Sequence, residues 1–308
     1  MSELCLVTGG AGFIGSHLVE GLLASGRRVR VLDDFSTGQQ ANLATHQVET
    51  AQGDVGSPAD VQRAMADVQM VFHLAALASV PLSLDKPAAS HHVNLTGTVH
   101  VLDAARRAGA TRVVIASSSA VYGNSAGDLQ RESDVPETLS PYAASKLAGE
   151  YYAQAFTRSF GLQTACVRFF NIFGPRQRDD SPYSGVIALF AAALAAGRTP
   201  TIFGDGLQSR DFTFVTDAVQ GLIKASEAAG AAGAYNIGTG QRTTILDLFT
   251  TMKRLLGSTI EVQHGPPRAG EVKHSCADIS RARRELGFQP AVSFEEGLRR
   301  TLDWYRTR

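Results

Sequence analysis

This 308-residue chain lacks the features that mark disulfide-rich, nucleic-acid-binding and membrane proteins. Its three cysteines, Cys5, Cys166 and Cys276, lie far apart and form neither a metal-ligand spacing nor a disulfide framework, which favours a reducing compartment. Basic and acidic residues balance at 29 each, so no net field attracts nucleic acid or an anionic membrane. The apolar stretch 188–196 is shorter than a membrane span, and no signal-peptide pattern precedes the first strand. We therefore expect a cytoplasmic protein without nucleic-acid or membrane partners.

Histidine does not supply a metal site either. Of the eight histidines, His91 and His92 are adjacent and point in different directions on a helix, and His73 falls inside a strand pattern. Packing, capping or solvent exposure accounts for them, and we predict no bound metal.

What the chain does contain is a regular alternation of strand and helix patterns. Apolar strands are predicted from Leu4 and at 29–32, 48–55, 70–76, 112–116, 164–169 and 233–238, and helices at 58–66, 94–108, around 142–146, and near 244–256, 279–286 and 294–305. This alternation predicts an α/β fold with a doubly wound, Rossmann-like parallel sheet and a smaller C-terminal α/β domain. We expect residues 1–168 and about 211–238 to form the first domain, interleaved with about 169–210 and 239–308 in the second.

A glycine-rich turn follows the first strand. Gly10, Gly12 and Gly15 match the Gly-x-Gly-x-x-Gly pattern, in which glycines permit a tight turn and close approach of a pyrophosphate to the helix N-terminus. The second strand ends in Asp33 and Asp34, and a carboxylate there accepts hydrogen bonds from a ribose and repels a 2′-phosphate. The alternative for Asp33 is a cap or turn residue. The order of strand, glycines, helix, strand and acid favours NAD.

Ligands of such sheets bind beyond the carboxyl ends of the strands, so residues at those ends are expected to share one crevice. The predicted cofactor-binding residues are Gly9, Gly12, Phe13, Ile14, Gly15, Asp33, Asp34, Phe35, Ser36, Thr37, Gly38, Asp54, Val55, Leu74, Ala75, Ala76, Ala78, Asn94, Ser117, Tyr142, Lys146 and Phe169.

Tyr142 and Lys146 lie four residues apart, one turn along the same face of a predicted helix. An ammonium beside a phenol favours the phenolate, so the pair can provide a base near neutral pH. By itself this spacing is common on surface helices. The hydroxyl of Ser119, or of Ser118, at the end of the 112–116 strand can pass a proton between a substrate hydroxyl and Tyr142. Alternatively, these serines bond their own backbone. We predict that Tyr142, Lys146, Ser119 and Ser118 are catalytic.

The run from Thr8 to Gly15, the three serines and the Tyr142/Lys146 pair resemble the extended short-chain dehydrogenase/reductases, over nearly the whole chain. Segments 168–175, 210–212 and 268–271 are most similar to nucleotide-binding signatures of UDP-sugar 4-epimerases. The resemblance implies that Tyr142 takes the proton of the sugar 4-hydroxyl while a hydride passes from C4 to NAD⁺. The 4-ketose then turns and takes the hydride back on its other face.

The same resemblance implies a set of substrate-binding residues. They are Ser79, Val80, Ser118, Ser119, Tyr142, Phe170, Asn171, Val186, Thr201, Phe203, Gln208, Arg210, Asn236, Arg268, Glu271 and Ser275. Asn171, Arg210 and Arg268 are expected at the UDP diphosphate, where the forked guanidinium donors suit phosphate oxygens. Either arginine alone is equally well explained as a surface ion-pair partner.

Ser275 bears on the choice of sugar. In the family likeness it occupies the wall facing the C2 substituent, where a tyrosine restricts many 4-epimerases to UDP-glucose and UDP-galactose. A small serine leaves room for an acetamido group, although Leu82 replaces an arginine that N-acetyl-specific enzymes often carry. We expect the chain to use UDP-GlcNAc and UDP-GalNAc together with UDP-Glc and UDP-Gal.

Three other functions compete with this interpretation. A 4,6-dehydratase of the family carries Asp-Glu where this chain has Ser119-Ala120, and decarboxylases usually carry a glutamate at the position of Ala120. A UDP-glucuronate 4-epimerase needs only one suitable basic side chain. A non-catalytic NAD-binding protein has no use for Tyr142, Lys146 and a strand-end serine together. Family members commonly form homodimers, and we expect one here, although core packing explains the apolar stripe of 95–105 equally well.

Overall fold

A parallel sheet forms the centre of the molecule. The structure is a computed structural model that describes residues 2–124, 127–180, 184–267 and 272–307. Seven strands, all parallel, pair in the order β11-β6-β5-β4-β1-β2-β3. They are β1 (Leu4–Thr8), β2 (Arg28–Asp33), β3 (Glu49–Gln52), β4 (Met70–His73), β5 (Arg112–Ser118), β6 (Gln163–Phe169) and β11 (Gly233–Ile237). The predicted Rossmann-type sheet is thus confirmed, including its late strand near residue 233.

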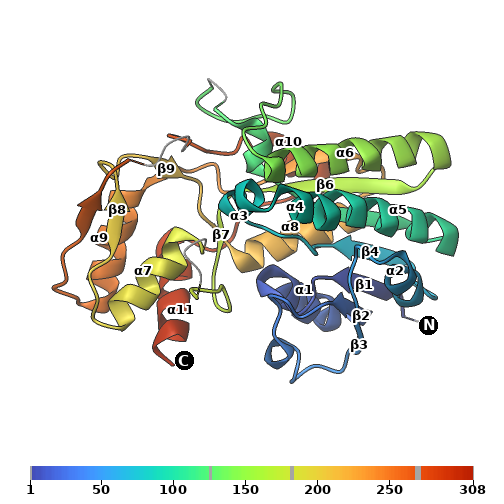
Figure 1. Ribbon diagram of the computed structural model, residues 1–308, viewed down its shortest axis with the longest axis horizontal. Coiled ribbons are helices and arrows are strands. Elements are labelled where there is room, and N and C mark those ends of the chain that lie inside the picture. The colour runs from blue at the N-terminus through green and yellow to red at the C-terminus, as the bar shows by residue number, and fades with distance from the viewer. Residues whose placement is uncertain (1, 125–126, 181–183, 268–271, 308) are drawn as a thin grey trace.

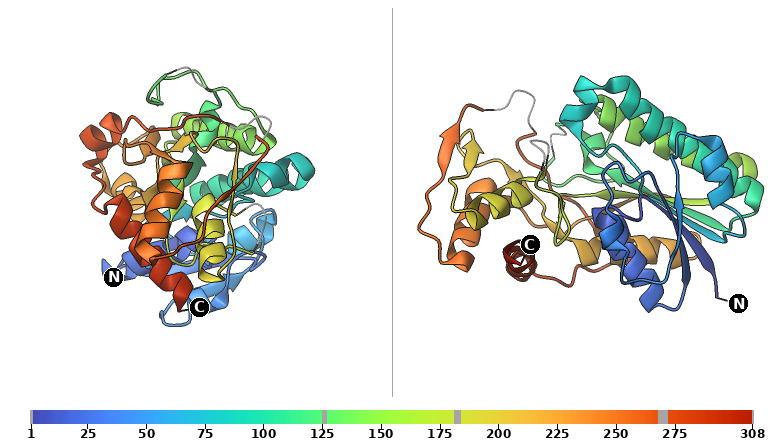
Figure 2. Two further views of the ribbon diagram at one scale, coloured as in Figure 1. Left: turned by 90° about the vertical axis from the view of Figure 1, so that its left-hand side faces the viewer. Right: turned by 60° about the horizontal axis from the view of Figure 1, so that its bottom comes forward.

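Helices cover both faces of the sheet (Figures 1 and 2). One face carries α1 (Phe13–Ala24), α8 (Val215–Glu227) and α10 (Ser280–Leu286), and the other carries α2 (Pro58–Ala64), α5 (Gly97–Ala108) and α6 (Pro141–Phe160). Alternate residues of β1 serve the two cores, with Cys5 and Val7 in one and Leu4 and Leu6 in the other. Each fully buried Leu or Val contributes roughly 1.5–3 kcal/mol of hydrophobic stabilisation. Burial on both faces explains why the strands are almost continuously apolar.

The helix predicted at 94–108 is divided in the structure. After α3 (Val80–Asp85) and α4 (Pro87–His91), a π-helical turn occupies His92–Thr96 and leads into α5. Within this wider turn Asn94 is buried and bonds the backbone of Leu77, with Leu77 N 2.8 Å from its Oδ1. π-Turns inside helices are often found at functional sites, and this one supports a loop that lines the central cavity.

A third core lies beside the sheet and is built mostly from the C-terminal half of the chain. It gathers Phe173, Phe190, Phe249 and Leu298 with their neighbours. Its elements are β7 (Ile172–Phe173), α7 (Val186–Ala195), β8 (Thr201–Phe203), β9 (Ser209–Arg210), β10 (Thr213–Phe214), β12 (Thr243–Thr244), α9 (Ile245–Leu256), β13 (Gln263–Gly265) and α11 (Phe294–Arg306). The strands pair only in twos, as β10-β7, β12-β9 and β13-β8. Strands of two or three residues show no sequence period, which is why the sequence did not predict them.

The domain boundaries at 168, 211 and 238 stay a prediction. Phe212, Phe214 and Val215 come from the stretch assigned to the first domain, yet they pack in the third core. Figure 1 shows the α7–α9–α11 group standing beside the carboxyl ends of the sheet strands, with the C-terminus on the same side.

Candidate active site

A cavity of about 1060 Å³ opens along the carboxyl ends of the sheet strands and reaches the C-terminal elements. Its lining includes most of the predicted cofactor-binding residues, together with all four predicted catalytic side chains. The structure therefore brings together residues that are as far apart in the sequence as Gly9 and Ser275.

The glycine turn between β1 and α1 has no room for a side chain at Gly9 or Gly15. Gly9 has a φ of +71°, and a Cβ there would lie 2.8 Å from the amide nitrogen of Ala75. A Cβ on Gly15 would lie only 2.1 Å from the carbonyl oxygen of Gly9. Gly12 begins α1 without a side-chain cap, so the first amides of the helix remain available to an anion. This cradle fits the pyrophosphate of a dinucleotide.

Asp33 at the end of β2 is held rigidly. Its Oδ2 accepts a hydrogen bond from Ala11 N and its Oδ1 from Phe35 N, each at 2.9 Å. Burial raises the pKa of Asp33, while these two amide bonds act in the opposite direction. A carboxylate has about four acceptor positions, so two remain for the hydroxyls of a ribose. Asp34 is exposed, and its Oδ1 accepts hydrogen bonds from the backbone nitrogen and the Oγ of Ser36 in the turn after β2.

Tyr142 and Lys146 lie on the first turns of α6, which Ser140 caps by accepting from Ala143 N at 3.1 Å. The Lys146 Nζ is 5.9 Å from the centroid of the Tyr142 ring and donates to the Ala116 carbonyl at 2.9 Å. Burial lowers the pKa of Lys146 to about 8. Burial also raises the pKa of Tyr142, because a phenolate enclosed by protein loses its hydration. In the absence of NAD and substrate, the charge of Lys146 does not reverse this shift.

The three serines after β5 have different partners. Ser117 donates to the carboxylate of Glu150. The Ser118 hydroxyl acts against the rise in the Tyr142 pKa, and its Oγ accepts from Ala120 N at 3.1 Å. Ser119 begins the 3₁₀ turn Ser119–Tyr122 and lines the cavity. These contacts favour Ser118 over Ser119 as the hydroxyl beside Tyr142, although a proton relay through either serine stays a prediction.

His73 lies beneath this site and is neutral. Its Nδ1 is 2.8 Å from Thr8 Oγ1 and its Nε2 is 2.9 Å from Thr98 Oγ1. Burial lowers its pKa to about 3, and the charge of Lys146 contributes further. Because Thr98 donates its own proton to Asn94 O, it must accept from His73 Nε2. His73 is therefore a packed and hydrogen-bonded histidine, as the sequence predicted.

The substrate side of the cavity includes Asn171, with a φ of +31°, and Arg210. Ser275 is buried and donates from Oγ to Gln130 Oε1 at 3.0 Å. Sequence reasoning missed Gln130, because only the tertiary fold brings it to Ser275, 145 residues away in the chain. It also missed Arg176 and Arg178, which line the cavity from the loop after β7.

Several predicted residues do not line the cavity. Phe170 is fully buried against Tyr122, with ring centroids 6.0 Å apart, and the buried Asn236 accepts from the Tyr122 hydroxyl at 2.6 Å. Both therefore support the wall from behind. The others that lie outside the lining are Phe35, Gly38, Asn94, Val186, Thr201, Phe203 and Gln208.

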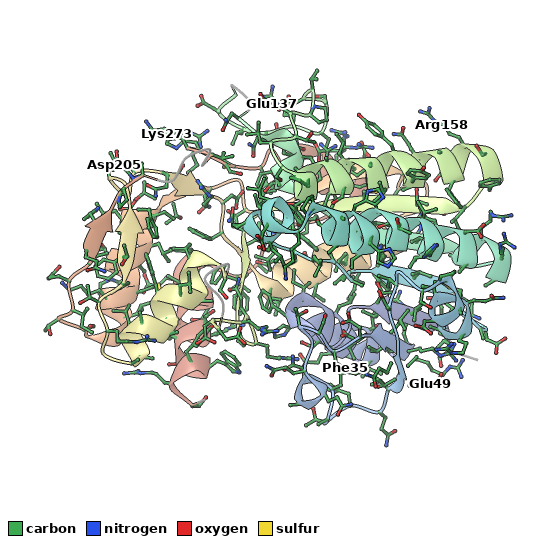
Figure 3. All side chains as sticks on the ribbon, viewed as in Figure 1. Phe35, Glu49, Glu137, Arg158, Asp205 and Lys273 are labelled. Carbon is green, nitrogen blue, oxygen red and sulfur yellow. The ribbon has the colours of Figure 1, made fainter. Side chains whose placement is uncertain are left out.

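These outer residues have identifiable structural contacts. Phe35 follows β2 in Figure 3 and packs on the sheet core. A Cβ on Gly38 would approach Asp33 Oδ1 to 2.7 Å. Gln208 donates to Phe203 O at 2.8 Å, and Thr201 accepts from Gln263 at 2.7 Å. Arg268 and Glu271 lie outside the described residues.

Comparison with known families accounts for this combination of sheet, glycine turn and Tyr/Lys pair. Residues 5–238 match the NAD dependent epimerase/dehydratase family, and the chain belongs to this family. Its cofactor is NAD, in agreement with the fit of the glycine cradle and Asp33.

The relatives cover almost the whole chain. A UDP-glucose 4-epimerase from Mycolicibacterium smegmatis is 40% identical and is matched over 98% of both chains. A UDP-N-acetylglucosamine 4-epimerase from Methanobrevibacter ruminantium, solved with UDP-N-acetylmuramic acid, has a TM-score of 0.95 and 38% identity over 100% of this chain and 99% of its own. The UDP-glucose 4-epimerase from Thermus thermophilus, solved with NAD, has a TM-score of 0.91 and 37% identity over 98% and 99%.

The described residues contain neither a membrane-spanning helix nor a cluster of metal ligands. No helix among them is long and apolar enough to cross a membrane. No group of three or more His, Cys, Asp or Glu side chains among them could hold a metal ion.

Proposed function

We propose that this chain is an NAD-dependent UDP-hexose 4-epimerase that interconverts UDP-GlcNAc with UDP-GalNAc, and UDP-Glc with UDP-Gal. The observation that carries the proposal is the shared cavity. Its lining holds the glycine cradle and Asp33 together with Tyr142, Lys146, Ser118 and the small Ser275. The similarity to epimerases of both UDP-glucose and UDP-N-acetylglucosamine supports this substrate range.

Each side chain has a definite task in this reaction. Tyr142 accepts the proton of the sugar 4-hydroxyl and later returns it to the 4-keto oxygen, and the Ser118 hydroxyl acts against the rise in its pKa. Lys146 is fixed by the Ala116 carbonyl and supplies positive charge next to the phenolate as it forms. NAD⁺, when bound, supplies a positively charged nicotinamide ring that accepts the hydride from C4 of the sugar.

The rest of the substrate needs anion binding and room. Arg210 and Asn171 line the cavity where a diphosphate and its nucleoside would lie, and Arg210 is a forked donor suited to phosphate oxygens. Rotation of a 4-ketose about its phosphate linkage requires space, which a cavity of about 1060 Å³ provides. Ser275 presents a small side chain to that space, and this allows an acetamido group as well as a hydroxyl.

One assay tests the proposal. The purified protein is incubated with UDP-Glc, UDP-Gal, UDP-GlcNAc, UDP-GalNAc or UDP-glucuronate, without added reductant, and the sugars are separated by chromatography. We expect the 4-epimer of each of the four neutral sugars and no net NADH. Epimerisation of UDP-glucuronate alone, release of CO₂ from it, or net NADH formation would each replace the proposal with a different activity of the family.

We also propose that the chain is a cytoplasmic homodimer that associates through α5 and α6. Three aromatic side chains of α6 are exposed, namely Tyr151, Tyr152 and Phe160, whose exposed fractions are 58%, 45% and 56%. Light scattering with size-exclusion chromatography tests the dimer. Charged substitutions at Tyr151 and Tyr152 should convert it to a monomer, and an unchanged mass would move the interface elsewhere.

A further inference from the structure

The buried side of α6 continues beyond the Tyr142/Lys146 pair. Glu150 lies one further turn along the same face, at the spacing i, i+4 from Lys146. It is buried, with 9% of its surface exposed, although a glutamate is rarely buried without a partner. The proposed epimerase chemistry does not use its carboxylate, so its presence behind the catalytic helix needs an explanation.

The carboxylate of Glu150 is surrounded by donors from two neighbouring strands. Arg168 on β6 donates to both carboxylate oxygens, with Nε 2.9 Å from Oε1 and Nη2 2.6 Å from Oε2. Ser117 on β5 donates to the same Oε1. Ser117 and Arg168 are paired in the sheet register, so the two donors are presented side by side. This arrangement fixes the position of the Glu150 carboxylate.

Two of the α6 residues contact the end of β5. Lys146 donates to the Ala116 carbonyl at 2.9 Å, and Glu150, one helical turn further on, accepts from Ser117, the next residue of the strand. Glu150 is thus part of the same docking surface that orients the catalytic pair, and Ser117 itself lines the cavity.

The charges around Lys146 are few. Its Nζ makes no contact with Glu150 short enough to count as an ion pair among the described residues, so the carboxylate acts on it through the electrostatic field. The titratable groups that face Lys146 are Tyr142 and Glu150 on α6, His73 on β4, and Cys166 on β6, and Arg168 lies behind Glu150 as its ion-pair partner. On β5, the Ala116 carbonyl that accepts from Lys146 carries no charge. His73 and the Cys166 thiol are neutral, which leaves Glu150 as the negative charge nearest to Lys146 along the helix.

We propose that Glu150 is a positioning residue for the Tyr142/Lys146 pair, because its carboxylate, fixed by Ser117 and Arg168, holds α6 in place on the end of β5 and places a negative charge one helical turn behind Lys146. The catalytic part of this inference rests on the proposed function. Burial lowers the pKa of Lys146 to about 8, while Cys166 and Glu150 both act in the opposite direction. Without that negative charge the ammonium is lost at a lower pH, and Tyr142 then has no cation beside it.

The test replaces Glu150 by glutamine and measures the protonation of Lys146 directly. The chain has five lysines, so lysine labelled with ¹³C at Cε gives a small NMR spectrum, in which the Lys146 signal is identified by its loss in Lys146→Arg. We expect the Lys146 titration midpoint to fall by about one pH unit in Glu150→Gln. The alkaline limb of the kcat profile for epimerisation should move by the same amount and in the same direction. A Lys146 midpoint that does not fall in Glu150→Gln would overturn the proposal.

Companion variants separate positioning from folding. Glu150→Gln leaves Arg168 buried without its partner, which can prevent folding, so Glu150→Gln/Arg168→Gln is measured as well. Because it removes a positive charge together with the negative one, it should lower the Lys146 midpoint by less than Glu150→Gln does, and a midpoint at or above that of the wild type would contradict the proposal. Glu150→Asp retains the charge and should keep the midpoint near that of the wild type. Asp217→Asn removes a different buried carboxylate, which accepts from Ala291 N and Val292 N, and should lower stability without moving the Lys146 midpoint. A shift in Asp217→Asn equal to that in Glu150→Gln would contradict a specific role for Glu150.

The two readouts also distinguish this inference from the proposed function. The NMR titration needs neither substrate nor turnover. A shifted midpoint in a chain that does not epimerise UDP-sugars would leave Glu150 as the residue that controls Lys146 and would refute only the proposed reaction. Active epimerisation with an unshifted midpoint would refute only the role of Glu150.

Discussion

Substitution of Gly15 by alanine tests the cofactor cradle more sharply than any change in a catalytic side chain. A Cβ at this position would lie 2.1 Å from Gly9 O and 2.8 Å from Gly10 Cα, whereas real Cβ atoms essentially never come within 3.0 Å of such atoms. Both atoms belong to the backbone, so neither can rotate away. The turn and the helix must therefore separate by roughly 1 Å.

The magnitude follows from that displacement. Overpacking in a close-packed region costs about 1–3 kcal/mol and occasionally more, and a misplacement of about 1 Å at a site can cost about 100-fold. Because the displaced amides are those proposed to hold the pyrophosphate, we expect NAD to bind on the order of 100-fold more weakly to Gly15→Ala, or about 2.7 kcal/mol. Isothermal titration calorimetry on protein freed of nucleotide measures the Kd.

Substitutions at two other glycines serve as controls. A Cβ on Gly12, in the same turn, would lie 3.2 Å from Gly9 O, which a small adjustment relieves, so Gly12→Ala should lose no more than about tenfold in NAD affinity. A Cβ on Gly149 in α6 would meet only Thr98 Cγ2 at 3.6 Å, so Gly149→Ala should bind NAD normally and gain up to about 1 kcal/mol in stability. Wild-type NAD affinity in a folded Gly15→Ala protein would refute the cradle.

Three further predictions concern the substrate, the proton path and pH. Ser275→Tyr should lower kcat/KM for UDP-GlcNAc by about 10–100-fold, because the tyrosine fills the space for the acetamido group, and should change kcat/KM for UDP-Glc by less than about threefold. An equal loss on both substrates would show that Ser275 does not determine substrate choice. Steady-state assays should show kcat falling by at least about 100-fold in Ser118→Ala but by less than about tenfold in Ser119→Ala, and the reverse order would make Ser119 the relay. The pKa of His73 is about 3 in the folded protein against 6.5 ordinarily, so unfolding takes up a proton between these values, and stability must fall as the pH falls through this window. Urea unfolding should show a slope of up to about 1.4 kcal/mol per pH unit that His73→Gln abolishes, and an unaltered slope would mean that another group titrates.

The local features of the site could be predicted from the sequence. The glycine turn, Asp33 and the spacing of Tyr142 and Lys146 each lie within one short segment, and the topology of a parallel sheet brings strand ends together without further information. For this reason the sequence also predicted most of the cavity lining and the core strand β11.

Contacts between distant segments could not be predicted in the same way. The bond from Ser275 to Gln130 and the contacts of Glu150 with Ser117 and Arg168 depend on tertiary register, for which a single sequence holds no signal. Phe170 follows the cavity-lining Phe169, but its side chain points into the core, since successive residues in an extended segment face opposite ways.

The direction of the Tyr142 pKa shift also differs from the expectation based on spacing. Proximity to Lys146 predicted a lowered pKa, whereas the structure encloses the phenol and burial raises the pKa. A sequence shows which charges are neighbours on a helix, but it does not show how much water each of them loses. The extent of desolvation appears only when the packing of β5 against α6 is known.

The central claim is that Tyr142 moves the proton of a sugar 4-hydroxyl while the hydrogen at C4 leaves and returns within one closed site. Incubation of UDP-galactose carrying deuterium at C4, followed by mass spectrometry and NMR of both epimers, tests this most directly. The account predicts that UDP-glucose is formed with the deuterium retained at C4, without net NADH, and that Tyr142→Phe reduces this conversion by at least about 100-fold. Loss of the deuterium to solvent, or undiminished conversion by Tyr142→Phe, would contradict it.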